Sequence, residues 1–447
     1  MFRSQNLSNL QSPSNLKSVL AQLTALHPKK IDLGLGRIER VLGALGDPHL
    51  HLPPSVHIAG TNGKGSTTAF LRAMIESNGQ TAHVYTSPHL VKFNERITLG
   101  SQEISDEVLL NALQRVMDAN AGAPLSFFEA TTAAAFLAFS EHPADYALIE
   151  VGLGGRYDAT NVFNPAVSLI TPINYDHAEF LGRDLAGIAR EKAGIIKDHV
   201  PVFTGRQTDV VAAVLRNEAA KHRAPIQCLT EDFRAYREQD RMVFDADDVL
   251  LDLPRPALIG SHQIDNAGVA IAGARSLGLP DKAIADGLSA VSWPARMQSL
   301  TTGPFADMVA ESGGELWLDG GHNPHAAAAL ANVMADLQAR KERVLVLVMG
   351  ILGNKDAGKF LDAFAGLASC VVAVDIPGSP TLAPETLKEL AENRGMIGQV
   401  ANNLTDAVQR AINTGEALSR EEATELIIPP RVLICGSLYL AGQVLSA

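Results

Sequence analysis

A glycine-rich segment that follows a short apolar run constrains this chain more than any other feature. Residues 56–59 suit a buried strand, Gly60-Thr-Asn-Gly-Lys-Gly65 supplies three glycines and one lysine, and residues 64–77 show helical spacing of apolar side chains. A glycine-rich turn between a strand and a helix directs backbone N–H groups and the positive helix end toward one point. We therefore predict a phosphate site, with Lys64 contacting the outer phosphates.

This loop differs from the standard Walker A pattern. In that pattern four residues separate the first Gly from the Gly-Lys pair, and Ser or Thr follows the Lys. Here two residues separate Gly60 from Gly63, and Gly65 follows Lys64. The hydroxyl that binds Mg²⁺ must come from Ser66 or from elsewhere in the chain. The alternative is an ordinary turn with an exposed lysine, but strand, loop and helix occur in the order that phosphate binding requires.

Composition indicates a globular protein that binds neither membranes nor nucleic acid. A chain of 447 residues is long enough for two or three domains, and no apolar run approaches the roughly 20 residues that span a bilayer. The polar N-terminus does not resemble a signal peptide, and the cysteines fit no disulfide or zinc pattern. The net charge of −12 disfavours nucleic acid but not small anions. We expect a cytoplasmic monomer, since no coiled-coil pattern or extended apolar stretch is evident.

Alternating strand and helix patterns predict an α/β fold. Strand-like runs occur at residues 56–59, 81–85, 146–151, 166–171 and 200–204, with helical patterns between most of them. This order favours a mainly parallel sheet. The polar, turn-rich residues 226–255 indicate a small β excursion. A second α/β pattern follows Trp293-Pro-Ala-Arg-Met297, with strand-like runs at 315–319, 343–349, 370–376 and 431–436.

These patterns predict two domains. Residues 1–297 form a P-loop-containing ATPase domain with an N-terminal extension, and residues 298–447 form a smaller Rossmann-like α/β domain. Ligands of open α/β sheets bind outside the carboxyl ends of the strands. We therefore expect the active site in a cleft between the two domains.

Several candidate ligands follow predicted strands or helices of the first domain. Ser87 either supplies the missing Mg²⁺ hydroxyl or caps a helix before Pro88. Glu150 ends an apolar strand, where it either holds Mg²⁺ or is a surface carboxylate. His177 is either a ligand of a second ion or an ordinary structural histidine. Composition alone indicates no more for Lys192 than a solvated cation near a helix end.

Two further clusters carry polar residues. Asp158 and Asn161 lie in a loop suited to substrate contact or to turns. The preceding Gly152-Leu-Gly-Gly155 superficially resembles a dinucleotide loop, but its spacing differs from G-x-G-x-x-G. In the second domain, Asp319 suits ribose hydroxyls or a substrate amine, and His322 suits a carboxylate or phosphate. Helix capping is the alternative there, although capping would not need the histidine.

Together these motifs resemble the folylpolyglutamate synthase and dihydrofolate synthase family of the Mur ligase superfamily. The matching segments extend over nearly the whole chain: Asp32-Leu-Gly-Leu-Gly-Arg-Ile38, residues 59–66, Ser87-Pro-His-Leu90, Phe127-Phe-Glu129, residues 150–161, Asp176-His177, residues 190–194, 294–298 and 319–324, Lys355-Asp356 and Gly436-Ser437. The resemblance implies an ATP-dependent amide ligase of folate biosynthesis and one-carbon metabolism. ATP would phosphorylate a carboxylate, and L-glutamate would attack the acyl phosphate. The acceptors implied are dihydropteroate and tetrahydrofolate.

The resemblance also implies roles for individual residues. The nucleotide would contact Thr61, Asn62, Gly63, Lys64, Gly65, Ser66, Asn266, Arg296 and Asp319. Two Mg²⁺ ions would be held by Ser87, Glu150, His177 and a carbamylated Lys192, and a monovalent cation is also allowed. Phe128, Asp158 and Ala159 would line the dihydropteroate pocket, with Ser437 near the glutamate. The implied catalytic residues are Lys64, Lys192 and His322. Ala295 and Gly321 stand where the family often has Gly and Ala, which are small-for-small changes.

Three other functions compete with this interpretation. A Mur ligase acting on a UDP-sugar peptide would carry a separate N-terminal domain, whereas 55 residues precede the first predicted strand. An NTPase or kinase would hydrolyse ATP without needing glutamate. A dinucleotide-dependent oxidoreductase would change nicotinamide absorbance.

Overall fold

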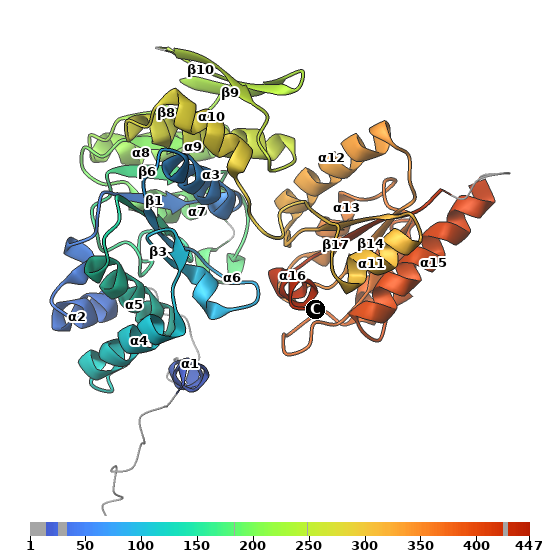
Figure 1. Cartoon of the computed structure of the whole chain (residues 1–447), viewed down its shortest axis with the longest axis horizontal. Coiled ribbons are helices and arrows are strands. Elements are labelled where there is room, and N and C mark those ends of the chain that lie inside the picture. Colours follow the sequence, from blue (N-terminus) through green and yellow to red (C-terminus); the bar gives the residue numbers. More distant parts are fainter. Residues whose placement is uncertain (1–14, 26–33, 183, 248, 423–427) are drawn as a thin grey trace, which may run out of the picture.

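Two large sheets, each with helices on both faces, organise the chain in this computed structural model (Figure 1). The structure describes residues 15–25, 34–182, 184–247, 249–422 and 428–447. The first sheet has eight strands in the order β4 (Gln102–Glu103), β3 (Ile97–Leu99), β2 (Ala82–Tyr85), β5 (Tyr146–Glu150), β1 (Ser55–Ala59), β6 (Val167–Ile170), β7 (Val202–Thr204) and β8 (Ile226–Cys228).

Strand β1 lies inside the first sheet and is buried along its whole length. It pairs in parallel with β5 on one side and β6 on the other, whereas β3 and β4 add an antiparallel edge. Successive side chains of a strand point to opposite faces, so Val56 and Ile58 enter one core cluster and leave His57 on the other face. An apolar run covered on both faces is typical of a strand in a parallel sheet.

Helices cover both faces of the first sheet. On the Val56 face lie α3 (Lys64–Ser77), α9 (Ser261–Ser276) and α10 (Asp281–Ala290). The opposite core cluster contains residues of α1 (Leu16–Ala25), α2 (Gly36–Ala44), α4 (Asp106–Asn120) and α5 (Phe127–Glu141). The remaining elements are η1 (Pro48–Leu50), η2 (Phe93–Arg96), α6 (Ala178–Leu181), α7 (Leu185–Lys192), η3 (Ala193–Ile195) and α8 (Asp209–Lys221).

The second sheet repeats this architecture on a smaller scale. Its order is β12 (Gln298–Leu300), β13 (Glu315–Leu318), β17 (Arg431–Cys435), β14 (Leu345–Met349), β15 (Cys370–Ala373) and β16 (Ile397–Val400). Only β12 is antiparallel to its neighbour among these described strands. One face carries α12 (Pro324–Arg340), α13 (Ala357–Asp362) and α14 (Pro384–Glu392), and the other α11 (Pro304–Glu311), α15 (Leu404–Glu422) and α16 (Leu438–Leu445).

The predicted α/β class with mainly parallel sheets is confirmed. The expected β excursion at 226–255 differs in detail, because Ile226–Cys228 is the edge strand β8 of the first sheet. The excursion itself is the antiparallel sheet β9 (Phe233–Glu238), β10 (Arg241–Ala246) and β11 (Val249–Pro254). The domain boundary at 297/298 stays a prediction, although β12 begins at Gln298. Asp32 and Leu33 of the first matching segment lie outside the described residues.

No helix in the described part of the chain is long and apolar enough to cross a membrane.

Gly287 allows α10 to lie directly against α3, the helix that begins at the phosphate loop. A Cβ atom built on Gly287 would lie 2.6 Å from Cα of Met74. We expect Gly287→Ala to lower the free energy of unfolding by about 1–3 kcal/mol, because the two helix backbones would have to separate. Urea unfolding measures this change, with Ser289→Ala on the exposed side of α10 as the control. Equal unfolding midpoints for the two variants would contradict the prediction.

Candidate active site

The glycine-rich loop joins β1 to α3 as the sequence predicts. Gly63 has a φ angle of +90°, and a Cβ atom there would lie 2.3 Å from Oδ1 of Asn266. A side chain at Gly65 would come within 3.0 Å of the Trp293 ring. Glycine is therefore required at Gly63 by both the backbone conformation and the close approach of α9.

Two lysine side chains converge on one carbonyl of this loop. Nζ of Lys64 donates to the Gly60 carbonyl at 3.2 Å, and Nζ of Lys192 donates to the same oxygen at 2.9 Å. Burial, and then the charge of Lys64, lower the pKa of Lys192 to about 7. The interpretation of Lys192 as a solvated cation is wrong, because this residue is 6% exposed and has an amine that is partly neutral near pH 7.

Glu150 lies at the end of β5 and faces the same loop. Its carboxylate is buried, 3.8 Å from Nζ of Lys64, and accepts a hydrogen bond from the backbone of Ser87. Burial raises the pKa of Glu150, while Lys64 and Arg296 oppose the rise. The surface-carboxylate alternative is therefore wrong. The helix-cap alternative for Ser87 is wrong too, since the next helix after Ser87 begins only at Phe93.

A cavity of about 270 Å³, which we call the nucleotide cavity, opens beside the loop. All the residues predicted to contact nucleotide line it: Thr61, Asn62, Gly63, Lys64, Gly65, Ser66, Asn266, Arg296 and Asp319. The buried Asp319 carboxylate accepts from the backbone N–H groups of Met297 and Gly321 at 2.8 and 2.6 Å. Helix α12 is instead capped by Asn323, whose Oδ1 accepts from the Ala326 N–H. Asp319 thus fixes the end of β13 against the connection between the two sheets.

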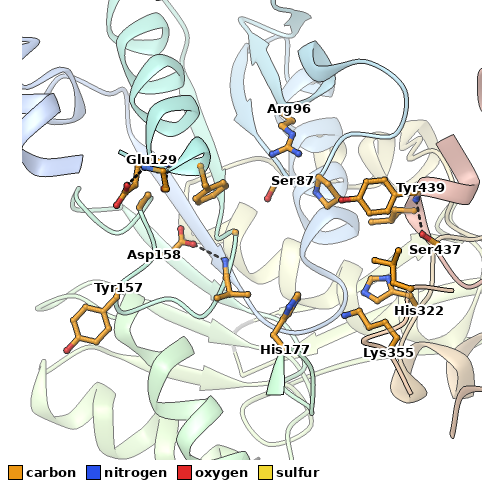
Figure 2. A pocket seen from close by; sticks show the side chains of 18 of the residues that line it. Ser87, Arg96, Glu129, Tyr157, Asp158, His177, His322, Lys355, Ser437 and Tyr439 are labelled. Atoms are coloured by element: carbon orange, nitrogen blue, oxygen red, sulfur yellow. Dashed lines mark hydrogen bonds between the residues drawn. The ribbon is translucent and has the colours of Figure 1, made fainter. Parts of the chain in front are cut away.

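A second cavity of about 370 Å³, which we call the acceptor cavity, adjoins the first (Figure 2). It contains the predicted substrate residues Phe128, Asp158, Ala159 and Ser437. The Phe128 ring lies against Gly152, where a Cβ atom would be 2.3 Å from Cζ. The carboxylate of Asp158 accepts from Leu153 N at 2.8 Å and from the hydroxyl of Thr160 at 2.6 Å. Asp158 therefore holds the loop that shapes the cavity.

Side chains from the two halves of the molecule, one half built on each large sheet, meet between these cavities. Nζ of Lys355 lies 2.6 Å from Oδ1 of Asp176, and Nδ2 of Asn323 lies 3.2 Å from Oδ2. Nε2 of His322 is 3.7 Å from the same Oδ2. Burial alone would raise the pKa of Asp176, but His322, His177 and Lys355 hold it well below its ordinary value. Asp176 is therefore an anion that joins the two sheets.

His177 lies at the same junction and lines both cavities. Its Nε2 is 3.9 Å from Oδ2 of Asp176. Burial lowers the pKa of His177 to about 4 despite that carboxylate, with Lys355 and Lys64 adding to the effect. A neutral imidazole near pH 7 has a lone pair available for a metal ion or a proton.

Sequence reasoning did not select four residues that line the acceptor cavity: Arg37, Arg96, Lys355 and Tyr439. Lys355 lies in a matching family segment, so a signal was present. Arg96 ends η2, and its Nε donates to Nδ1 of His89 at 2.9 Å, while Figure 2 shows its guanidinium pointing into the cavity. No motif in the sequence marks Arg96, whose position depends on how β2 and β3 pair.

Known proteins share both halves of this arrangement. Residues 58–274 match the model of the Mur ligase middle domain, and residues 305–447 match the dihydrofolate synthetase C-terminal domain. A Bacillus subtilis protein named dihydrofolate synthase/folylpolyglutamate synthase is 37% identical over 432 residues, which cover 92% of this chain and 94% of that protein. The chain belongs to this family. As a member of the dihydrofolate synthase/folylpolyglutamate synthase family it is an ATP-dependent ligase, as predicted.

Solved structures of the family show the same architecture. E. coli FolC in complex with DHPP and ADP superposes with a TM-score of 0.85 at 29% identity, covering 98% of each chain. A bifunctional folylpolyglutamate synthase/dihydrofolate synthase with Mn, AMPPNP and L-glutamate bound gives 0.82 at 29% identity, covering 98% of this chain and 99% of that one. The oxidoreductase interpretation of residues 152–155 is wrong for this synthase, and no helix follows those glycines before β6.

The lowered pKa of Lys192 makes stability depend on pH. Between about pH 7 and the ordinary value of 10.5, the unfolded chain holds a proton that the native chain has released, so raising the pH favours the native state. From pH 7 to 9 in CO₂-free buffer, we expect wild type to gain about 2 kcal/mol of unfolding free energy relative to Lys192→Met. Urea unfolding at both pH values measures the gain.

A surface lysine provides the control for this pH dependence. Lys282 of α10 has a side chain that is 84% exposed, so Lys282→Met should leave the pH dependence of wild type unchanged. If Lys192→Met and Lys282→Met gave the same pH dependence, Lys192 would not be the titrating group.

Proposed function

We propose that this synthase joins L-glutamate to 7,8-dihydropteroate and to tetrahydrofolate glutamates, converting ATP to ADP and phosphate. The observation that carries the proposal is that the nucleotide and acceptor cavities meet at a common wall, formed by Ser87, Pro88, Gly152, His177, His322 and Leu438. A terminal phosphate in one cavity and a carboxylate in the other can therefore come into contact. The solved relatives support this assignment, since their bound molecules include ADP, DHPP, AMPPNP and L-glutamate.

In the first step the acceptor carboxylate attacks the terminal phosphorus of ATP. The bond to the bridging oxygen breaks, so ADP leaves and an acyl phosphate forms. Lys64 and the N–H groups at the start of α3 stabilise the charge that spreads over the phosphoryl oxygens. Catalysis of this kind depends on positioning, which the fixed loop between β1 and α3 supplies.

In the second step the amine of L-glutamate attacks the acyl carbon, and phosphate leaves as the amide forms. His322 is oriented for this step, because its Nδ1 lies 3.0 Å from the Gly320 carbonyl. A carbonyl only accepts, so Nδ1 carries a proton and Nε2 is the nitrogen left to exchange one. His322 can then take the proton that the attacking amine loses. Ser437, at the start of α16, lines the same end of the cavity.

The acceptor cavity suits a pterin linked to a carboxylate. Phe128, Tyr157 and Tyr439 provide aromatic surfaces for flat rings. Arg96 provides a guanidinium whose Nη groups can pair with a carboxylate. Burial lowers the pKa of Arg96, but a guanidinium stays charged at physiological pH.

The side chains around Lys64 fit two Mg²⁺ ions only if substrate oxygens supply further ligands. Among the described residues no three His, Cys, Asp or Glu side chains form a metal-binding group. Ser87 and Glu150 would hold the first ion beside phosphate oxygens. His177 and a carbamate on Lys192 would hold the second. The cation would polarise phosphoryl oxygen.

Carbamylation of Lys192 is favoured by its pKa of about 7, because CO₂ reacts with the neutral amine. The product carbamate adds the anionic oxygens that the metal site otherwise lacks. It also replaces a positive charge beside Lys64 with a negative one, which removes their repulsion. A monovalent cation near these anions is part of the same proposal.

The cellular setting is also a proposal. The three cysteines Cys228, Cys370 and Cys435 are free and buried, which suits a reducing cytoplasm. Both cavities are lined by residues of this chain, which supports the proposal of a monomer.

The deciding experiment measures phosphate release from ATP with L-glutamate and either 7,8-dihydropteroate or tetrahydrofolate. We expect turnover with both acceptors and a loss of at least about a hundredfold in Lys64→Ala, because the phosphoryl charge loses its main cation. Lys282→Ala serves as the control. Turnover with one acceptor would limit the enzyme to that reaction, and phosphate release without an acceptor would indicate an NTPase.

A second experiment tests Lys192. We expect Lys192→Ala to lose turnover and to regain part of it with added short-chain carboxylic acids, which would occupy the carbamate position. Wild type depleted of CO₂ should lose activity and recover it with bicarbonate. Normal turnover of Lys192→Ala, or wild-type activity that is indifferent to CO₂, would rule out the carbamate.

A further inference from the structure

A third cavity lies on the far side of α9 and is not used in the proposed reaction. Its volume is about 290 Å³, close to the 270 Å³ of the nucleotide cavity. Its wall combines β9 and the segment after β11 with the start of α9 and the C-terminal half of α12. Because α12 packs on the second sheet, both halves of the molecule contribute to this cavity, which we call the arginine cavity.

The charges in this cavity favour an anion. Its charged lining residues are four arginines and two aspartates, namely Arg206, Arg237, Arg255, Arg340, Asp265 and Asp336. Nε of Arg206 lies 3.3 Å from Asp265, and Arg237 pairs at 3.3 Å with Asp240 outside the cavity. In the part of the chain that the structure describes, neither Arg255 nor Arg340 forms an ion pair. Each leaves a planar guanidinium free to bind two oxygens of a phosphate.

The floor of the arginine cavity is apolar. Leu258 and Ile264 come from the first half of the molecule, and Val333 and Leu337 come from α12. Tyr236 adds an aromatic ring that is 42% exposed. An inorganic anion would leave this surface in water, whereas a ligand with a planar ring would cover it.

The start of α9 adds a third favourable element. Gly260 has a φ angle of +122°, and a Cβ atom there would lie 2.9 Å from Val333 of α12 and 2.5 Å from His262. This glycine lets the N-terminus of a 16-residue helix approach the other half of the molecule. The Gln263 N–H donates to the Gly260 carbonyl, but no side chain caps that end, so the positive end of the helix dipole is directed at the cavity.

We propose that the arginine cavity binds a small polyanion with a planar ring, of the nucleoside polyphosphate class, between the two halves of the molecule. Arg255 and Arg340 bind its phosphates from opposite halves, and the apolar floor takes the ring. Arg206 and Asp265 also line the nucleotide cavity, so the two occupants are neighbours. The proposal does not rest on the ligase reaction, because binding requires neither acceptor nor glutamate.

The test is the number of AMPPNP molecules bound per chain, measured by equilibrium dialysis without acceptor or glutamate. We expect two in wild type. Arg255→Ala and Arg340→Ala should each weaken the second binding event, which is binding in the arginine cavity, about tenfold or more, since each removes a charge-assisted contact. Arg234→Ala is the matched control, because Arg234 is an exposed arginine of β9 that does not line the cavity. It should leave both sites intact.

Further variants separate this site from the nucleotide cavity. Lys64→Ala should weaken binding in the nucleotide cavity and leave binding in the arginine cavity unchanged. A single molecule bound by wild type would overturn the proposal, as would a second site lost in Lys64→Ala and kept in Arg255→Ala. Equal weakening by Arg234→Ala would show a general charge effect and would also overturn it.

A competition experiment tests the role of the ring. Tripolyphosphate should displace the second AMPPNP about tenfold less effectively than ATP, because it cannot cover the apolar floor. Equal displacement would overturn the assignment of a ring-bearing ligand.

Discussion

The convergence of Lys64 and Lys192 on the carbonyl of Gly60 is the interaction on which this site depends. Two ammonium groups beside one carbonyl, one of them buried, form an arrangement that is unfavourable without an anion nearby. The fold tolerates it by letting Lys192 release its proton easily and by placing Glu150 beside Lys64. A phosphate in the loop would neutralise the remaining charge. The geometry of the loop is therefore already biased toward anionic ligands.

The placement of the cavities follows from how the two sheets face each other. Strands β1 and β5 deliver the phosphate loop and Glu150 at their carboxyl ends, while β13 and β17 deliver Asp319 and Ser437. Residues of both halves line the nucleotide cavity and the acceptor cavity. Asp176 and Lys355 hold the two halves together at 2.6 Å, so the geometry of the common wall depends on an ion pair between residues 179 positions apart. Motion of one half relative to the other would change both cavities at once.

Local patterns predicted much of this structure, and long-range contacts account for what they missed. The strand-like runs are all strands, since buried parallel strands have continuous apolar sequences. The short strands β3, β4, β12 and β16 escaped prediction because two to four residues carry too little pattern. The residues predicted to contact nucleotide and acceptor line the two cavities, and their roles stay predictions. The burial of Lys192 was not foreseen from the sequence itself, since it depends on α7 packing beneath a loop 132 positions earlier.

Long-range contacts also decide the environment of the other residues for which the sequence left alternatives open. Whether Glu150 is a surface or a buried carboxylate depends on whether β5 is an edge or an interior strand, and only the pairing of β1 and β2 on its two sides decides this. Arg255 and Arg340 belong to different halves and share no motif. Their meeting at one cavity is visible only in three dimensions.

The Asn323 side chain both caps a helix and joins the two halves of the molecule, and the residue that follows it protects its amide from deamidation. Its Oδ1 caps α12, and its Nδ2 donates to Asn62 and Asp176 across the junction. Asparagine side chains deamidate when the backbone nitrogen of the following residue attacks the side-chain carbonyl. The following residue is Pro324, which has no N–H to make that attack. The proline that starts α12 therefore also protects the amide at the junction from spontaneous deamidation over the lifetime of the protein.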